Sequence, residues 1–288
     1  MSHSGLVLSG RKYARVVRSS LKERVGALQG PPPGLAVIMV GDDSASKVYV
    51  GAKEKACKRV GINSSVINMP ADSSEADVLR FVDELNSDDK IHGILVQLPL
   101  PDHISVDRIA SAVLPEKDVD GFHPVNVGRL WRGEDGLFPC TPSGIVGLLR
   151  HYDITMSGKN ALIVGRSNIV GKPMAALLLR ENCTVTVAHS RTVDLMKQCG
   201  QADILVVAVG RAEMIKKDWV KPGAVVVDVG MNRNSSGKLV GDVDYHDVME
   251  VCSAITPVPG GVGPLTIAYL LENTFKARSR QKTTTEPN

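Results

Sequence analysis

Lys53 lies among uncharged side chains in a stretch that otherwise carries many charges. The stretch reads KVYVGAKEKACKRVGI from Lys47 to Ile62, and we interpret it as an α-helix with about 100° of rotation per residue. Side chains within roughly 60° of Lys53 on that helix include Tyr49, Val50, Ala56, Cys57 and Val60. A lysine on an apolar face is pushed towards its neutral form, and a neutral amine can take a proton from water. The alternative is a lysine whose stem packs while its ammonium reaches solvent.

A second candidate site is the glycine turn in LIVGRSNIVGKPMAALLL, where a predicted strand leads through Gly165 to Gly171 into a helix. Glycines let a backbone approach a pyrophosphate, and the N-terminus of a helix favours negative charge. The spacing is G-x-x-x-x-x-G and not G-x-G-x-x-G, so a purely structural turn is the alternative.

The residues around this turn indicate which nucleotide it would bind. A site for NAD usually carries Asp or Glu about 20 residues after the glycine loop. The next predicted strand instead ends in VAHSRT, with Ser190 and Arg191 at that place, and Arg166 lies inside the turn. Guanidinium and hydroxyl groups suit a 2′-phosphate, so the sequence predicts NADP as the cofactor. A solvated arginine at a loop tip is the alternative.

The composition excludes several classes of protein. The chain has 288 residues, of which 43% are hydrophobic and 23% charged, enough for about two domains. A net charge of +3 and 4% aromatic residues give no indication of a nucleic-acid partner. No apolar stretch is long enough for a signal peptide or a membrane span. The five cysteines form no C-x-x-C pair, so we expect free thiols, no metal site and a cytoplasmic location.

Short strand patterns alternate with helical patterns along the chain, which predicts parallel sheets covered by helices. The first half has predicted strands at 34–41, 64–70 and 93–101, with helices at about 11–29, around Lys53 and at 74–88. The second half has predicted strands at 160–165, 184–189, 203–209 and 224–230, all nearly continuous apolar runs typical of buried strands. Between them, residues 102–143 are rich in Pro, Gly, Asp and His, a composition typical of functional loops.

These motifs have counterparts in two families of dehydrogenase. The pair Tyr49 and Lys53 is similar to that of short-chain dehydrogenases, but here it precedes the glycine turn and does not follow it, which excludes that family. The segments YVGAKEKACKRVGI, GILVQLPLP, PEKDVDGFHPVNVGRL, PCTPSG, GRSNIVGKPMAALLL, HSRT and ITPVPGGVGPLT occur in this order. Together they closely resemble the bifunctional methylenetetrahydrofolate dehydrogenase/methenyltetrahydrofolate cyclohydrolase family of the bacterial type, over almost all of residues 5–277.

The resemblance implies an α/β fold with two α/β domains and a cleft between them. An N-terminal folate-binding catalytic domain would span residues 1–141, with a returning helix in 264–288, and a Rossmann-like NADP domain would span 142–263. It implies two reactions of one-carbon metabolism, namely NADP-dependent oxidation of 5,10-methylenetetrahydrofolate and hydrolysis of the methenyl product to 10-formyltetrahydrofolate. A monofunctional NAD(P)-dependent dehydrogenase is the alternative. The resemblance also implies a homodimer.

The resemblance further implies roles for single residues. Lys53 matches the family's catalytic lysine, Gln97 the residue that hydrogen-bonds and orients it, and Asp120 the carboxylate that holds the pterin edge. Tyr49 would stack on or bond the substrate. Other expected folate contacts are Pro99, Gly260, Gly261 and Pro264. The expected cofactor contacts are Thr141, Gly165, Arg166, Ser167, Ile169, Ser190 and Arg191.

Overall fold

The structure is a computed structural model that describes residues 5–283. It divides into two compact units, one formed by Val16–Cys140 with Ile267–Asn288 and the other by Met1–Arg15 with Thr141–Thr266. Below they are called the lysine unit, after Lys53, and the glycine-turn unit. The outer ends of the two domains predicted from the sequence, residues 1–4 and 284–288, lie outside the described residues.

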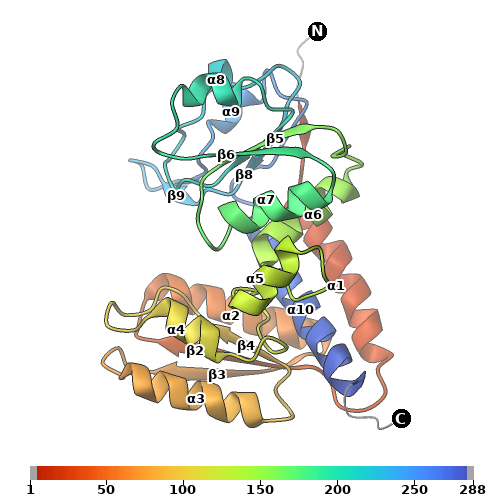
Figure 1. The fold of residues 1–288 in the computed structure, drawn as a ribbon, viewed down its shortest axis with the longest axis vertical. Coiled ribbons are helices and arrows are strands. Elements are labelled where there is room, and N and C mark those ends of the chain that lie inside the picture. Colours follow the sequence, from red (N-terminus) through yellow and green to blue (C-terminus); the bar gives the residue numbers. More distant parts are fainter. Residues whose placement is uncertain (1–4, 284–288) are drawn as a thin grey trace. The chain divides into compact units, whose positions relative to one another are not determined.

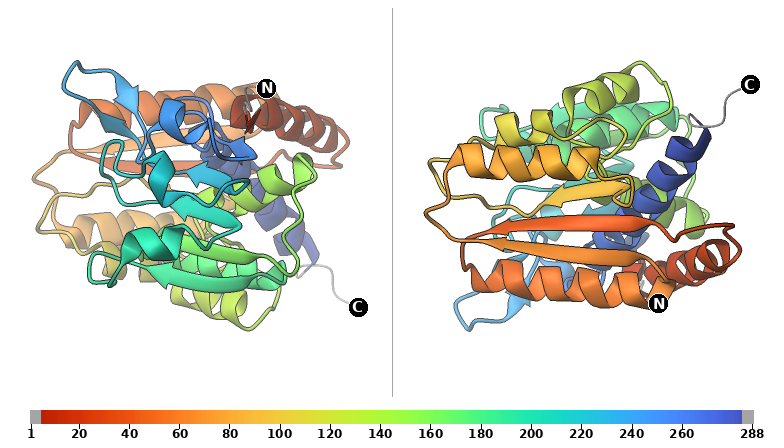
Figure 2. Two further views of the ribbon diagram at one scale, coloured as in Figure 1. Left: turned by 90° about the horizontal axis from the view of Figure 1, so that it is seen from above. Right: turned by 90° about the horizontal axis from the view of Figure 1, so that it is seen from below.

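The lysine unit contains a three-stranded parallel sheet in the order β3-β2-β4, which confirms the predicted βαβ pattern. Its strands are β2 (Gly34–Val40), β3 (Asn63–Met69) and β4 (Gly93–Val96). Parallel strands need crossover connections, and here α2 (Ser44–Val60) leads from β2 to β3 and α3 (Glu75–Ser87) from β3 to β4. Figure 2 shows the three strands with helices on both sides.

The alternation of side chains along β2 explains this layering. Leu35 and Val37 pack on one face with apolar residues of α2. Ile38 and Val40 pack on the opposite face with residues of α3 and of α4 (Val106–Ala112). Because successive side chains of a strand point to opposite faces, an entirely apolar strand of this kind is covered twice.

Three further helices contribute to the lysine unit in whole or in part, and Figure 1 labels them. They are α1 (Gly10–Gly26), α5 (Pro124–Trp131) and α10 (Gly263–Thr283). Leu21 of α1 and Leu270 of α10 belong to the same core cluster as Leu35 of β2. The returning helix expected within 264–288 is therefore present as α10, up to the last residue that the structure describes.

The glycine-turn unit contains a six-stranded parallel sheet in the order β1-β11-β8-β7-β5-β6. Its strands are β1 (Leu6–Val7), β5 (Asn160–Val164), β6 (Thr184–Ala188), β7 (Ile204–Val207), β8 (Val225–Asp228) and β11 (Ala254–Ile255). The four strands predicted in the second half are all present. Strands β1 and β11, which are only two residues long, were not predicted from the sequence.

Shorter elements complete the glycine-turn unit. They are α6 (Cys140–His151), α7 (Gly171–Arg180), α8 (Leu195–Cys199), the 3₁₀-helix η1 (Lys217–Trp219), the hairpin of β9 (Asn232–Arg233) with β10 (Leu239–Val240), and α9 (Tyr245–Val248). The expectation that every strand of this half is buried on both faces is wrong for β6. It forms the edge of the sheet, and Val187 in it is 38% exposed. Edge strands have a neighbour on one side only, so their residues need not be apolar throughout.

Candidate active site

Helix α2 carries Lys53, and its ends are fixed by ordinary capping chemistry. The side chain of Asp43 accepts a hydrogen bond from the backbone N–H of Ser46 and so caps the first turn. Gly61 ends the helix in the left-handed conformation, with φ of +84°, which a residue with a side chain adopts at a cost. The rotation of the helix, and with it the direction of Lys53, is set by Val50 and Cys57, which pack in the core of the unit.

The side chain of Lys53 is held inside the lysine unit by Gln97. Lys53 is only 8% exposed, and its Nζ donates a hydrogen bond to Oε1 of Gln97 at 2.8 Å. Nε2 of Gln97 in turn donates to the carbonyl of Leu98 at 2.6 Å. The hydrogen bond expected from the resemblance is therefore present, and the interpretation of Lys53 as a lysine that reaches solvent is wrong.

Burial determines the ionisation of Lys53. Loss of hydration lowers the pKa of its ammonium, and the nearby charge of Asp120 opposes this shift, followed by the thiols of Cys140 and Cys57. The lowered pKa increases the fraction of neutral amine at a given pH. The site can therefore hold a proton acceptor next to a carboxylate.

Asp120 is half-buried and lies in the loop before α5. Burial raises the pKa of its carboxyl to about 7, against an opposing effect of Lys53, and the charge of Asp118 adds to the increase. Asp120 also lines a small, mainly apolar pocket together with Leu98 and Phe122. A carboxylate at an apolar pocket can accept hydrogen bonds from a flat ligand that bears N–H groups.

Asp118 organises the loop that presents Asp120. Its carboxylate is buried and accepts hydrogen bonds from three successive backbone N–H groups and from one side-chain amide, those of Gly121, Phe122, His123 and Asn126. The bonds to the backbone close the turn DVDGFH. Both aspartates of DVDG line the pocket, but the carboxylate of Asp118 is occupied by the bonds that shape the loop.

Tyr49 and Pro99 also belong to the lysine unit. Tyr49 lies one turn before Lys53 on α2, and burial raises the pKa of its phenol. Pro99 follows a cis peptide bond from Leu98. The strand expected at 93–101 already ends at Val96, so Gln97 lies directly after a strand and not within one.

The other expected folate contacts lie in the glycine-turn unit. Gly260 has φ of +108°, and the N–H of Gly261 donates to the carbonyl of Pro257 at 2.7 Å. Pro264 is the second residue of α10. The grouping of these residues with Lys53 stays a prediction.

Part of the expected nucleotide site forms one pocket in the glycine-turn unit. Gly165, Arg166 and Ser190 line it, although Arg166 and Ser190 come from the ends of different strands. The other lining residues are Val164, His189, Leu195, Ala208, Val209, Arg211 and Met214. The pocket lies at the carboxyl ends of parallel strands, where ligands bind in open α/β sheets.

The glycines of the turn are required by close backbone approaches. A Cβ at Gly165, which has φ of +129°, would lie 2.3 Å from the carbonyl oxygen of Ala208, and one at Gly171 would lie 2.3 Å from that of Gly165. The hydroxyl of Ser167 accepts hydrogen bonds from the N–H groups of Val170 and Gly171 at the start of α7. The turn thus has the compact shape that a pyrophosphate needs, and the residues fit a dinucleotide.

Four expected cofactor residues do not line this pocket, namely Ser167, described above, and Ile169, Arg191 and Thr141. Ile169 is 45% exposed, and Arg191 is exposed, with its backbone N–H bonded to Nδ1 of His189. Thr141 shares a hydrogen bond of 2.7 Å with the hydroxyl of Thr266. Their contact with a nucleotide stays a prediction.

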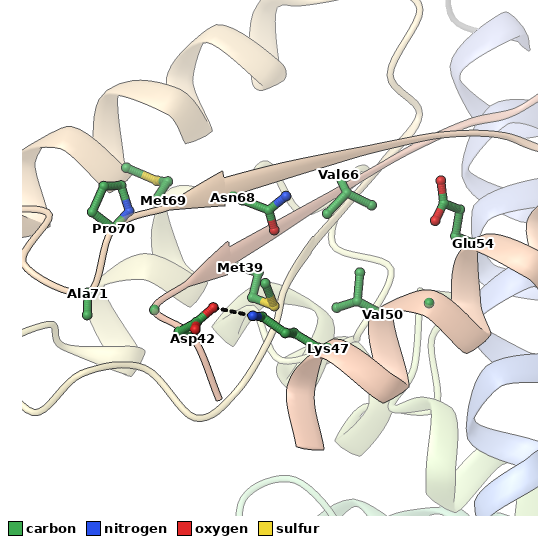
Figure 3. A pocket seen from close by; sticks show the side chains of 12 residues that line it. Met39, Asp42, Lys47, Val50, Glu54, Val66, Asn68, Met69, Pro70 and Ala71 are labelled. Carbon is green, nitrogen blue, oxygen red and sulfur yellow. Dashed lines mark ion pairs between the residues drawn. The ribbon is translucent and has the colours of Figure 1, made fainter. Parts of the chain in front are cut away.

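A larger pocket, of about 820 Å³, lies elsewhere in the lysine unit. Figure 3 shows it beside Lys47 and Glu54 of α2 and Asn68 of β3, with an ion pair between Lys47 and Asp42. Lys53 is not among its lining residues. None of the other catalytic or folate-binding residues expected in this unit lines it either, so this pocket, although large, is not part of the candidate active site.

All five cysteines are free, as predicted from the sequence, and the structure shows in addition that they are buried. Within residues 5–283, no helix is long and apolar enough to cross a membrane. Two residues of the site, Cys140 and Asp118, were not predicted from the sequence. Both were visible in quoted segments, PCTPSG and DVDG, but nothing in the pattern separates a buried thiol or a turn-forming carboxylate from a residue of an ordinary loop.

Comparison with known protein families and proteins gives a consistent result. The family described as "Tetrahydrofolate dehydrogenase/cyclohydrolase, catalytic domain" matches residues 8–120. The family described as "Tetrahydrofolate dehydrogenase/cyclohydrolase, NAD(P)-binding domain" matches residues 139–282. The chain is 53% identical over 278 residues to the bifunctional protein FolD of Listeria innocua, covering 96% of this chain and 98% of that relative.

Solved structures agree with this result. The chain resembles the bifunctional enzyme FolD, methylenetetrahydrofolate dehydrogenase/cyclohydrolase, of Campylobacter jejuni, with a TM-score of 0.95 and 49% identity, covering 96% of this chain and 100% of that one. It also resembles the Trypanosoma brucei methylenetetrahydrofolate dehydrogenase-cyclohydrolase in complex with NADP and an inhibitor. There the TM-score is 0.92 and the identity 38%, covering 97% of this chain and 99% of that one.

Proposed function

Because this chain belongs to the bifunctional methylenetetrahydrofolate dehydrogenase/cyclohydrolase family, we propose that Lys53 is the general base of its hydrolytic step. We propose further that Asp120 binds the pterin of the folate and that NADP is the preferred cofactor. The observation that carries the proposal is the buried hydrogen bond from Lys53 to Gln97.

Lys53 has the environment that a general base requires. Its lowered pKa leaves more of the amine neutral at physiological pH, and a neutral amine has a lone pair for a proton of the attacking water. Gln97 directs the amine through its carbonyl oxygen, while the amide nitrogen is occupied by the carbonyl of Leu98. The water then adds to the methenyl carbon as Lys53 takes its proton.

Asp120 is suited to a pterin because its two oxygens can accept parallel N–H bonds from the amide-like edge of the ring. With a pKa of about 7, the carboxyl group is ionised in a substantial fraction of molecules at neutral pH. The apolar residues of its pocket, Leu98 and Phe122 among them, support the flat faces of such a ring. Tyr49 would stack on or bond the substrate, and Pro99, Gly260, Gly261 and Pro264 would complete the folate surface.

NADP, when bound, supplies the acceptor for the hydride of methylenetetrahydrofolate. The chain's own contribution would be to hold it: the pocket lined by Gly165, Arg166 and Ser190 would take the nucleotide, with Gly165 at the pyrophosphate and Arg166 and Ser190 at the 2′-phosphate. Arg191, Ser167, Ile169 and Thr141 are proposed as further contacts. Hydride transfer itself depends chiefly on positioning the two reactants.

We also propose that the chain acts as a cytoplasmic homodimer. Five free, buried thiols suit a reducing compartment. Strand β3 is at an edge of its sheet, and such an edge presents unpaired backbone groups to a second chain. Light scattering on the purified protein tests the dimer by its mass.

Two absorbance assays test the catalytic proposal. The first follows methenyltetrahydrofolate formed from methylenetetrahydrofolate with NADP or NAD, and the second follows hydrolysis of methenyltetrahydrofolate without nucleotide. Activity in both, with NADP preferred in the first, supports the proposal. Activity in the first alone would favour a monofunctional dehydrogenase.

A further inference from the structure

The carboxylate of Asp242 is fully buried, with 0% exposure, and is surrounded by N–H donors. Its Oδ2 accepts hydrogen bonds from the backbone N–H groups of Val209 and Gly210, at 2.7 and 3.1 Å. Its Oδ1 accepts from the backbone N–H of Arg211 and from Nδ2 of Asn232, both at 2.8 Å. Such charge-assisted bonds are stronger than bonds between neutral groups, and three of the four hold successive residues of one segment.

That segment forms a wall of the nucleotide pocket. It follows β7, and Ala208, Val209 and Arg211 all line the pocket that also contains Arg166 and Ser190. The segment belongs to no helix or strand, so its N–H groups need partners from elsewhere. Asp242 provides these partners, although it does not line the pocket itself.

Asp242 is in turn fixed by a second buried carboxylate. Oδ1 of Asp228, at the end of β8, accepts a hydrogen bond from the N–H of Asp242 at 2.9 Å, and Oδ2 accepts one from the N–H of Val243 at 3.0 Å. A Cβ at Gly241 would lie 1.8 Å from Oδ2 of Asp228, so glycine is required for this approach. Asp228, at the end of β8, thus positions Asp242, and Asp242 positions the segment that follows β7.

We propose that Asp242 is a positioning residue of the cofactor site, which holds the backbone of residues 209–211 in the shape that receives the nucleotide. The inference rests on the proposed function of this pocket as the NADP site. Asp242 also holds the backbone of Arg211, which places a second cationic residue at the pocket that Arg166 lines. The adenosine end of the nucleotide would meet a wall that is already ordered before binding, which reduces the entropy lost on binding.

Calorimetric titration with NADP tests the inference without turnover. In Asp242→Asn an amide N–H₂ replaces an acceptor opposite the N–H groups of the wall. We expect the Kd of NADP to rise at least about tenfold, as for the loss of one hydrogen bond to a charged group. Asn232→Ala is the matched control, because it removes a hydrogen bond to the same carboxylate but none to the wall. Its Kd should stay within about twofold of wild type.

Each outcome decides between the two proposals. Tight NADP binding by wild type with an unchanged Kd in Asp242→Asn would overturn the positioning role alone. Equal weakening in Asn232→Ala would do the same, because it would indicate a general loss of structure. A wild-type protein that does not bind NADP would overturn the proposed function and this inference with it.

Hydrogen exchange gives a readout that does not depend on the variant being folded. In nucleotide-free wild type, the amide protons of Val209, Gly210 and Arg211 should exchange slowly, because Asp242 accepts all three. If they exchange as fast as in an unfolded chain, the wall is not held and the inference is wrong.

Discussion

The ammonium of Lys53 and the side-chain oxygen of Gln97 lie 2.8 Å apart, although 44 residues separate them in the sequence. The orientation of the amide is fixed from its other side, because Nε2 of Gln97 donates to the carbonyl of Leu98. Reversing the amide would direct an N–H₂ group at the ammonium and lose both bonds. The position of the amine therefore depends on a residue that has no proton chemistry of its own.

Replacing Lys53 by methionine should abolish the hydrolysis of methenyltetrahydrofolate. Methionine retains an unbranched apolar side chain but has no amine to accept a proton. General-base roles contribute about 10²–10⁴-fold, so we expect a rate at least about a hundredfold below wild type. Hydrolysis is measured by absorbance against the uncatalysed background, and the Kd of NADP by calorimetry serves as the control. A variant with more than about a tenth of the wild-type rate would exclude the role of general base.

Two substitutions of Gln97 should act in different ways. In Gln97→Glu a carboxylate faces Lys53 and favours its charged form, so the neutral fraction at pH 7 falls about tenfold for each unit by which the pKa rises. Hydrolysis should then be slow at pH 7 and recover as the pH is raised. In Gln97→Ala the amine loses its orientation at every pH, so no recovery is expected. Rate profiles from pH 6 to 10 for both variants provide the comparison, and identical profiles would contradict it.

The fold and the pairing of Lys53 with Gln97 were both predicted from the sequence, but on different grounds. Strands such as VVVD at β8 carry enough apolar residues for their type to be recognised locally. The partner of Lys53 came from a resemblance, since no periodicity connects residues on α2 and after β4. The exposure of β6 could not be predicted, because it depends on which strand lies at the edge. Asp242 was missed because its donors come from residues 209–211 and 232, which meet it only in the folded chain.

Replacing Asp120 by alanine should weaken folate binding and leave NADP binding nearly unchanged. Each hydrogen bond to a charged group contributes about 1.5–3 kcal/mol, which corresponds to roughly 10- to 150-fold in affinity. Calorimetric titrations with a folate analogue and with NADP measure the two affinities. Equal weakening of both ligands would instead indicate that Asp120, like Asp118, serves the shape of the loop.

The raised pKa of Asp120 also predicts how stability depends on pH. With a pKa of about 7 in the folded protein and an ordinary value of 3.8, the folded chain keeps a proton between these values that the unfolded chain has lost. This contribution to stability is complete below about pH 4 and is lost as the pH rises through about 7. The Asp120→Asn variant lacks this contribution. The Tm of the variant minus that of wild type should therefore be larger at pH 8 than at pH 5. If the difference between the two Tm values is the same at both pH values, the pKa of Asp120 is not raised in the folded protein.

The last prediction concerns the choice of nucleotide. Arg166 and Ser190 line one pocket, and the end of β6 offers no carboxylate for a ribose 2′-hydroxyl. Wild type should therefore prefer NADP over NAD, and Arg166→Ala should remove much of the preference, by roughly 10- to 150-fold in kcat/KM with NADP. Activity with NAD should change little, since NAD has no phosphate at that place.

Arg191 and Arg211 provide the comparison for Arg166. If Arg191 shares the phosphate, the double variant with Arg166→Ala should lose more of the preference than either single variant. Arg211→Ala tests instead the segment after β7 that lines the same pocket, whose backbone the carboxylate of Asp242 holds. An equal loss with both nucleotides in Arg166→Ala would mean that Arg166 supports the glycine turn and does not read the phosphate. A wild-type preference for NAD would overturn the assignment of NADP itself.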